Sequence, residues 1–116
     1  MQYLALIYTT ERSETGEPPD PETLARYRAF NEHATAQGAL VAANALQPTS
    51  MATTVRVRDG ETILTDGPFA ETREQLGGYY LLECDNLDRA IALAARIPAA
   101  AHGCVEVRPV MVIDEG

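Results

Sequence analysis

The most constraining feature of the sequence is the segment at residues 3–8 (YLALIY), which is apolar at both odd and even positions. A strand with one face in water alternates apolar and polar side chains, whereas a strand covered on both faces is apolar throughout. This segment is therefore predicted to be a strand in the middle of a sheet. The rest of the chain must supply neighbouring strands on both of its edges and cover for both of its faces.

A first helix is predicted to begin at Asp20 and to end at Gly38. The Asp20 carboxylate can accept hydrogen bonds from the free amides of a first turn, and Pro21 has no N–H group to leave unpaired. Glu22 suits the positive end of the helix dipole. Helical spacing then places four side chains on one broad face of this helix: Leu24, Tyr27, Phe30 and Ala34.

A second helix is predicted to begin at Asp85 or Asn86 and to end at Pro98, because proline cannot continue a helix. Its apolar residues follow the spacing i, i+3, i+4 and i+7, which is the spacing of one helical face. The residues of this predicted face are Leu87, Ala90, Ile91 and Ala94.

The remaining segments have strand patterns. Residues 53–65 predict a hairpin, because Val55 and Val57 alternate with polar neighbours and Asp59-Gly60 accepts the positive φ of a tight turn. A further strand is predicted to open at residues 39–43 and to end near Gln47-Pro48. Two more are predicted over residues 79–84 and about 105–113. Pro109 makes the last of these an edge strand or a bulged one, because proline donates no hydrogen bond.

The predicted order is β-α-β, a hairpin and β-α-β again, in a single domain of residues 1–116. Two right-handed βαβ crossovers in one small sheet describe a ferredoxin-like α+β fold, with an antiparallel sheet and two helices on one face. The other face of that sheet is then bare, and a second copy of the chain is the cover that we expect. We therefore expect a homodimer that closes a barrel or sandwich between its sheets.

The composition excludes several classes of function. The formal net charge of −8 leaves no basic face for nucleic acid or for an anionic membrane surface. All nine basic residues are arginine, so Schiff-base and lysine general-base chemistry are impossible. The apolar runs are shorter than the roughly 20 residues of a membrane span, and no basic region precedes the first of them. We expect a cytoplasmic protein.

The cysteine and histidine pattern predicts no metal and no cofactor. Cys84 and Cys104 match neither zinc-ligand nor redox-pair spacing; two small buried thiols are the favoured interpretation, and a disulfide remains open. His33 and His102 have no partners at ligand spacing, so each is predicted to be a surface or capping histidine.

The run at residues 65–79 (TDGPFAETREQLGGY) contains the segment Asp66-Gly67-Pro68-Phe69. Together with residues 2–8 (QYLALIY) and 105–110 (VEVRPV), it resembles the DGPF-type, YCII-related family over nearly the whole chain. The resemblance implies a dimeric α/β-barrel fold and implies little about activity, because most members have no assigned reaction. Many members are encoded beside extracytoplasmic-function-type sigma factors, which implies a sigma-factor accessory as one alternative.

A few members of the broader YCII group resemble small enzymes, including a dehydrochlorinase that acts on a chlorinated hydroxyquinol. Their proposed centre is a histidine on the first helix paired with an aspartate just after the second. Tyr27 and Ile97 stand at those two positions here. His33 lies on the same helix but two turns away, so the resemblance to the enzymes lacks its catalytic pair.

Asp66 is the leading candidate for a functional group, as a general base or as a ligand for a cationic group. The alternative is an Asx turn, in which Asp66 accepts the amides two and three residues on and Gly67 takes a positive φ beside Pro68. Phe69 is predicted to anchor the core or a dimer, with ligand stacking as the alternative.

Candidate ligand-binding side chains also occur near the ends of the last two predicted strands. Glu106 and Arg108 project from one strand face, where they form either an internal salt bridge or, between protomers, an anion clamp. Tyr79 and Tyr80 point to opposite faces, so one belongs to the core and the other can place its hydroxyl in a cleft. Gly77-Gly78 permits close approach of backbone or ligand.

Three functions follow from these residues. The favoured one is a small-molecule-binding or accessory dimer without catalysis. The second is a small lyase, isomerase or dehydrochlorinase-like enzyme that uses Asp66 with His33, Glu106 or Arg108. The third is a protein-interaction accessory to a sigma factor. For the first function, the candidate ligand-binding residues are Asp66, Phe69, Tyr79, Glu106 and Arg108.

Overall fold

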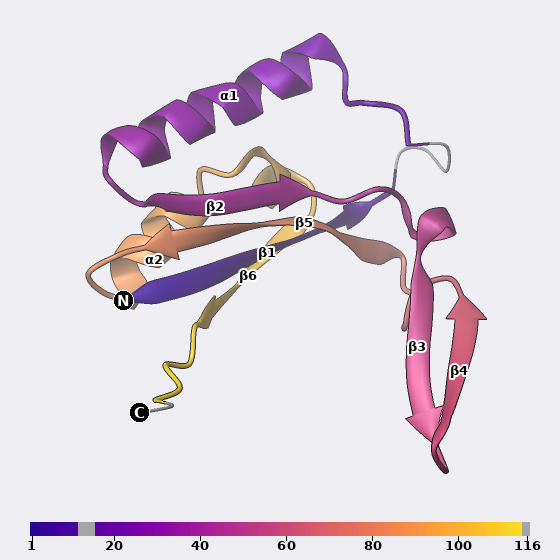
Figure 1. Ribbon diagram of the computed structural model, residues 1–116. Coiled ribbons are helices and arrows are strands. Elements are labelled where there is room, and N and C mark those ends of the chain that lie inside the picture. Colours follow the sequence, from indigo (N-terminus) through magenta and orange to yellow (C-terminus); the bar gives the residue numbers. More distant parts are fainter. Residues whose placement is uncertain (12–15, 115–116) are drawn as a thin grey trace.

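The computed structural model describes residues 1–11 and 16–114 and contains two sheets and two helices (Figure 1). The larger sheet has the strand order β2-β5-β1-β6, and every neighbouring pair in it is antiparallel. Its strands are β1 (Gln2–Thr10), β2 (Leu40–Ala45), β5 (Glu74–Glu83) and β6 (Cys104–Pro109). The helices are α1 (Pro21–Ala36) and α2 (Leu87–Ala94), with 3₁₀ turns η1 (Thr49–Met51) and η2 (Pro98–Ala101). Strands β3 (Thr53–Arg58) and β4 (Glu61–Asp66) form the smaller sheet.

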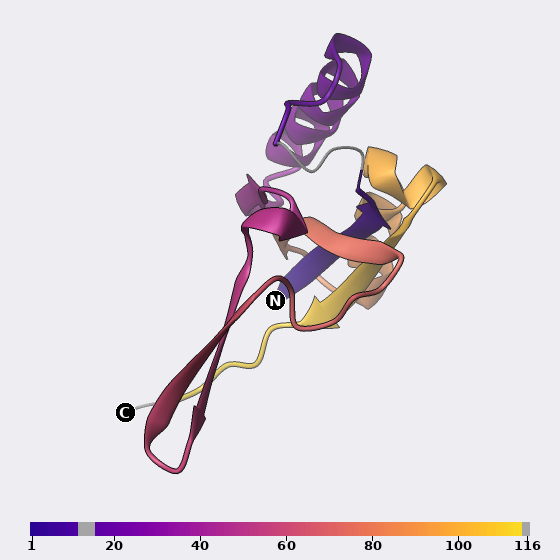
Figure 2. The ribbon, with the colours of Figure 1, turned by 90° about the vertical axis from the view of Figure 1, so that its right-hand side faces the viewer.

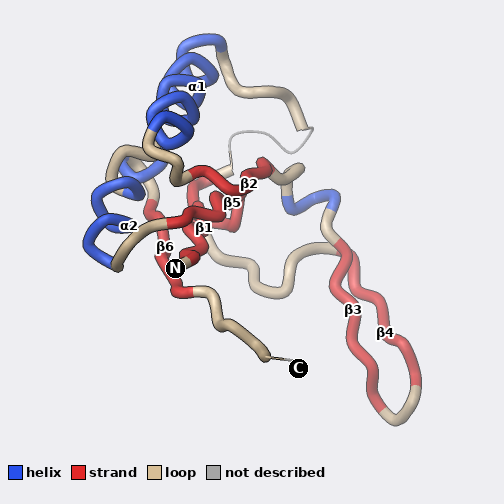
Figure 3. The backbone as a smooth tube through the Cα atoms, turned by 60° about the vertical axis from the view of Figure 1, so that its left-hand side comes forward, coloured by secondary structure: helices blue, strands red, loops and turns tan. Residues whose placement is uncertain are grey.

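The predicted α+β class is confirmed, and the arrangement is compatible with a ferredoxin-like fold. Strand β1 lies between β5 and β6, as its apolar sequence predicts. Figure 3 shows both helices on the same side of the larger sheet. The core between them is formed by side chains of β1, β5 and the helices, including Tyr3, Ala5, Ile7, Phe30, Ala34, Tyr80, Leu82, Ala90, Leu93 and Ile97.

Helix α1 has the predicted ends. The Asp20 Oδ1 atom accepts a hydrogen bond from the Thr23 amide at 2.8 Å, which satisfies a free donor of the first turn. Gly38 follows the helix with a φ of +68°, a conformation that glycine adopts without strain. On its inner face Phe30 and Ala34 are buried, whereas Leu24 remains exposed.

Two of the four residues predicted for the inner face of α2 are not on it. The helix begins after Asn86, whose side chain caps the Arg89 amide at 3.0 Å. Leu87 and Ile91 are exposed, and the buried residues are Ala90, Leu93 and Ala94. The buried face is centred on Ala90 and includes Leu93, because contact with the sheet, and not helical spacing alone, determines which side of the helix is covered. The helix also ends at Ala94, before Pro98, which instead begins η2.

Three strand boundaries differ from the predictions. Strand β5 begins at Glu74 rather than at Tyr79, because Gly77 is accommodated as a bulge between the pairs Ile7–Gly78 and Tyr8–Leu76. Strand β6 ends at Pro109 and is an edge strand, so the predicted continuation to residue 113 is wrong. Strand β1 extends to Thr10, two residues beyond the apolar segment of residues 3–8.

The predicted hairpin is confirmed and lies apart from the larger sheet (Figure 2). Asp59 and Gly60 have φ values of +52° and +78°, as a type I′ turn requires.

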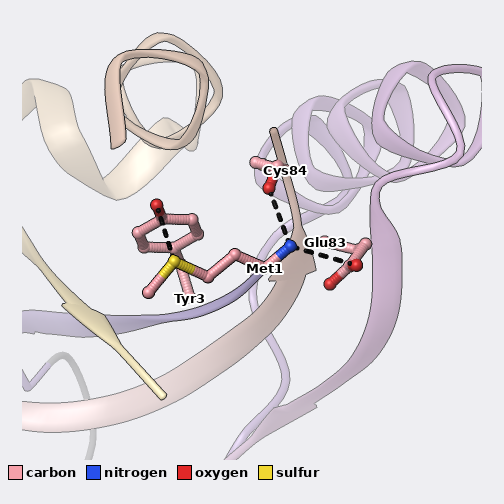
Figure 4. A network of polar contacts seen from close by, with 4 residues as sticks. All are labelled: Met1, Tyr3, Glu83 and Cys84. Carbon is pink, nitrogen blue, oxygen red and sulfur yellow. Dashed lines mark hydrogen bonds and ion pairs between the residues drawn. The ribbon is translucent and has the colours of Figure 1, made fainter. Parts of the chain in front are cut away.

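Polar contacts join the beginning of β1 to the end of β5 (Figure 4). The Met1 amino group lies 3.2 Å from the Glu83 Oε1 atom and 3.1 Å from the Cys84 carbonyl oxygen. The Tyr3 hydroxyl donates to the Met1 sulfur at 3.4 Å. Cys84 is buried, and burial raises the pKa of its thiol. Both cysteines are free and Cys104 is exposed, so neither the disulfide nor a second buried thiol is found.

Within the described residues, neither helix has the length and hydropathy needed to cross a membrane.

Candidate functional site

The face of the larger sheet that carries no helix, called the open face below, is organised in three rows across the strands. Because cross-strand partners share a face, the register places even-numbered residues of β1 on it. The first row is Asn44, Tyr79, Leu6 and Glu106, and the second is Ala42, Leu81, Leu4 and Arg108. The third row is Leu76, Tyr8 and Cys104.

The middle of the open face is apolar and its edges are polar. Leu4, Leu6 and Leu81 occupy the two central strands and are only half-buried, and both helices lie on the other side of the sheet. Edge strand β6 contributes Glu106 and Arg108, and edge strand β2 contributes one polar side chain, Asn44, beside Ala42. An apolar surface with a few polar groups at its edges is a composition that small-molecule sites share.

Two side-chain hydrogen bonds cross the open face. The Asn44 Nδ2 atom donates to the Tyr79 hydroxyl at 2.9 Å, and the Tyr8 hydroxyl donates to Glu106 Oε1 at 3.4 Å. Burial raises the pKa of Tyr8, and the Glu106 carboxylate raises it further. The Tyr8 hydroxyl therefore keeps its proton at neutral pH and can donate a hydrogen bond.

Arg108 has no hydrogen-bond or ion-pair partner among the residues that the structure describes. The internal salt bridge predicted between Glu106 and Arg108 is wrong. Residues two apart in a strand are about 7 Å apart along it, and Glu106 is engaged by the Tyr8 hydroxyl instead. The Arg108 guanidinium keeps its donors free on the open face.

Asp66 and Phe69 lie at the base of the hairpin, and no hydrogen bond or ion pair joins Asp66 to the side chains of the open face. The Asx turn is not formed, because the Asp66 carboxylate has no hydrogen-bond partner among the described residues. Gly67 stabilises the turn instead, with a φ of +104°. Its amide donates a hydrogen bond to the Ala52 carbonyl, and its carbonyl accepts one from the Thr54 hydroxyl, both at 2.8 Å. Phe69 is 83% exposed, so it is not a core residue of the single chain.

His33 lies on the helical side of the sheet and lines a hollow of about 230 Å³ with residues of α2 and the segment after it. His33 therefore lies on the opposite side of the sheet from Glu106 and Arg108. Tyr27 and Ile97, at the positions of the enzymatic pair, belong to the layer between helices and sheet; Ile97 is 1% exposed and Tyr27 is half-buried. Burial raises the pKa of the Tyr27 hydroxyl.

The structure thus brings Tyr79, Glu106 and Arg108 onto one face and keeps Asp66, Phe69 and His33 elsewhere. Sequence reasoning missed Tyr8 and Asn44. The signal for Tyr8 was its even position in the first strand, which it shares with Leu4 and Leu6. Asn44 gave no such signal, because its position depends on the register of β2 against β5. Within residues 1–11 and 16–114, no group of three His, Cys, Asp or Glu side chains is arranged to hold a metal ion.

The family comparison agrees with this fold. The model of the YCII-related domain matches residues 1–114. The chain belongs to the YCII-related family. A family relative from Rhizobium meliloti (strain 1021), described as an uncharacterized protein, is 38% identical over 120 residues; the match covers all of this chain and 97% of the relative. That description assigns no activity to the relative of this YCII-related protein.

Proposed function

We propose that this YCII-related protein is a small-molecule-binding homodimer in which the open faces of two sheets enclose the ligand. The observation that carries the proposal is the open face itself. Its half-buried leucines lie between rims of hydrogen-bonding side chains, and both helices are on the other side. Covering this face with a second copy encloses a space with an apolar lining and a few fixed polar groups.

The dimensions of the single chain support a second copy. The chain exposes 8359 Å², whereas a folded monomer of its mass exposes about 6,200 Å². Its radius of gyration is 16.2 Å, against about 13 Å for a compact chain of this length. An excess of about 2,000 Å² per chain is the amount that an obligate homodimer buries.

The side chains of the open face favour a ligand with an apolar body and an anionic group such as a carboxylate. Arg108 has its guanidinium donors free and presents the fork geometry that binds a carboxylate in a bidentate manner. Glu106 is engaged by Tyr8, so it does not compete for Arg108. Leu4 is the β1 neighbour of Arg108 and provides apolar contact beside the charge.

The proposal assigns binding and no reaction to the site. The positions at which the enzymatic relatives carry their catalytic pair hold Tyr27 and Ile97, which pack in the core. The carboxylate of Asp66 and the imidazole of His33 do not share the open face with Glu106 and Arg108.

The test uses 8-anilinonaphthalene-1-sulfonate, which combines an apolar ring system with an anionic group. We expect saturable fluorescence enhancement in the native dimer. Arg108→Gln should weaken binding about tenfold or more, because a hydrogen bond to a charged group contributes roughly 1.5–3 kcal/mol. Arg28→Gln on α1 is the matched control: it removes the same charge from the helical side and should leave binding unchanged.

Both variants should keep the thermal melting curve of the parent protein, so that dye binding to unfolded chains is excluded. Non-saturable dye binding, or equal dissociation constants for Arg108→Gln and the parent protein, would rule out the proposed site.

A further inference from the structure

The hairpin formed by β3 and β4 has one apolar face and one charged face. The register pairs Val55 with Leu64 and Val57 with Thr62, so the bulky apolar side chains Val55, Val57 and Leu64 lie on the same face. The opposite face carries charged residues of both signs together with Ile63: Arg56, Arg58 and Glu61. Strands with this alternation ordinarily pack their apolar face against a core.

The described part of the chain provides no such core for the hairpin. Val55, Val57 and Leu64 are 60%, 59% and 65% exposed, and the hairpin extends away from the larger sheet (Figure 2). Its main packing contacts are between its own two strands. A lone two-stranded hairpin is at best marginally stable in water. Its exposed apolar face therefore lacks the packing partner that would stabilise the hairpin.

The base of the hairpin is closed by hydrogen bonds between its two ends. The Gly67 amide donates to the Ala52 carbonyl, and the Thr54 hydroxyl donates to the Gly67 carbonyl, so both ends of the hairpin are tied together where it leaves the body of the chain. The two strands of the arm are thereby kept paired at its base. A preorganised arm loses less conformational entropy when it binds a partner.

We propose that the hairpin is a dimerisation arm whose Val55, Val57 and Leu64 face packs on a second copy of this chain. The exposed surface area of the chain indicates that the partner is a second copy. A standard interface buries about 800 Å² per partner, so a sheet-face contact of that size leaves more than half of the roughly 2,000 Å² excess exposed. The hairpin face, with Phe69 beside its base at 83% exposure, is apolar surface outside the open face that can account for this remainder.

In a two-fold dimer each copy gives one arm and receives one, so the contact occurs twice. The inference rests on the proposed homodimer and adds to it the surface that secures the dimer. It also predicts that the arms, and not only the open faces, determine how tightly the ligand-binding space is closed.

The test compares two adjacent residues on opposite faces of β4. Leu64→Asp places a charge on the apolar face, and Ile63→Asp places the same charge on the other face, where the residue is also exposed. In sedimentation-equilibrium experiments we expect Leu64→Asp to raise the dimer dissociation constant at least tenfold. Ile63→Asp should change the constant by less than about threefold.

Hydrogen exchange of the unsubstituted protein provides a second readout that needs no variant. The β3–β4 amides at the tip should be protected in the dimer and should lose protection on dilution to monomer. Unprotected hairpin amides in a stable dimer, or a Leu64→Asp dimer as tight as the parent, would overturn the arm and leave the sheet-face dimer standing. A monomeric parent protein would overturn both proposals.

Discussion

Tyr79 and Tyr80 are adjacent in β5, and their hydroxyl groups have different surroundings. The Tyr80 ring packs edge-on against Phe30, with ring centroids 4.8 Å apart, and its hydroxyl donates to Asn31 Oδ1 at 2.7 Å. Burial raises the pKa of Tyr80 to about 12. The Tyr79 hydroxyl accepts a hydrogen bond from Asn44 on the open face. One strand thus supplies a core residue and a site residue at consecutive positions.

The raised pKa of Tyr80 predicts alkaline instability. A tyrosine in the unfolded chain titrates near pH 10, so between about pH 10 and 12 the folded chain keeps a proton that the unfolded chain has lost. The free energy of unfolding must therefore fall as the pH rises through this range. Tyr80→Phe should make the fall shallower, as measured by urea unfolding at pH 9 and pH 11. Equal slopes for Tyr80→Phe and the parent protein would contradict the assignment.

Residue parity was the most successful sequence signal at this scale. It correctly placed one of the paired tyrosines in the core, and it placed Glu106 and Arg108 opposite Val105 and Val107. Partnerships between side chains could not be predicted in the same way. Glu106 bonds to a residue 98 positions earlier in the chain, and the strand order that brings them together is not a local property of the sequence.

Strand β5 shows how one element combines two requirements. At Gly77 a bulge shifts the register, and at Gly78 the backbone of β2 approaches closely. A Cβ atom at Gly78 would lie 2.8 Å from the Asn44 carbonyl oxygen, whereas one at Gly77 would have its nearest neighbour, Thr9 Oγ1, at 3.8 Å. The sequence predicted close approach at this pair of glycines but could not show which of the two required it.

Gly78→Ala is expected to destabilise the protein by about 1–3 kcal/mol, because the backbone of β2 must move to admit the methyl group. Gly77→Ala is the matched control and should be neutral or stabilising by up to about 1 kcal/mol, since alanine reduces the entropy of the unfolded chain. Urea unfolding measures both. Equal losses for the two variants would show that the Asn44 contact is not the limiting one.

The elements themselves were predicted from local patterns, and their boundaries were not. The caps Asp20 and Asn86 and the turn Asp59-Gly60 act through neighbouring backbone atoms, so their sequence signals are sufficient. The face that α2 buries and the length of β5 depend on contacts with distant strands. A local pattern of residue types carries no information about those contacts.

The whole molecule is flat and extended. Its principal dimensions are 47 × 46 × 18 Å, and its surface exceeds that of a compact monomer of the same mass by about a third. One layer of helices covers one face of one sheet, and the other face and the hairpin carry apolar residues that are only half-buried or exposed. In the proposed dimer, a second copy covers both surfaces and encloses the space in which Arg108 and Tyr79 lie.

The molar mass in solution, measured by light scattering across micromolar concentrations, tests the central claim most directly. The chain has a mass of 12.6 kDa, and we expect the unsubstituted protein to show twice that value. Leu6→Asp, with its charge in the middle of the open face between Tyr79 and Glu106, should return the mass to that of one chain. A single-chain mass for the unsubstituted protein, or a Leu6→Asp variant that keeps the doubled mass, would contradict an open face closed by a second copy.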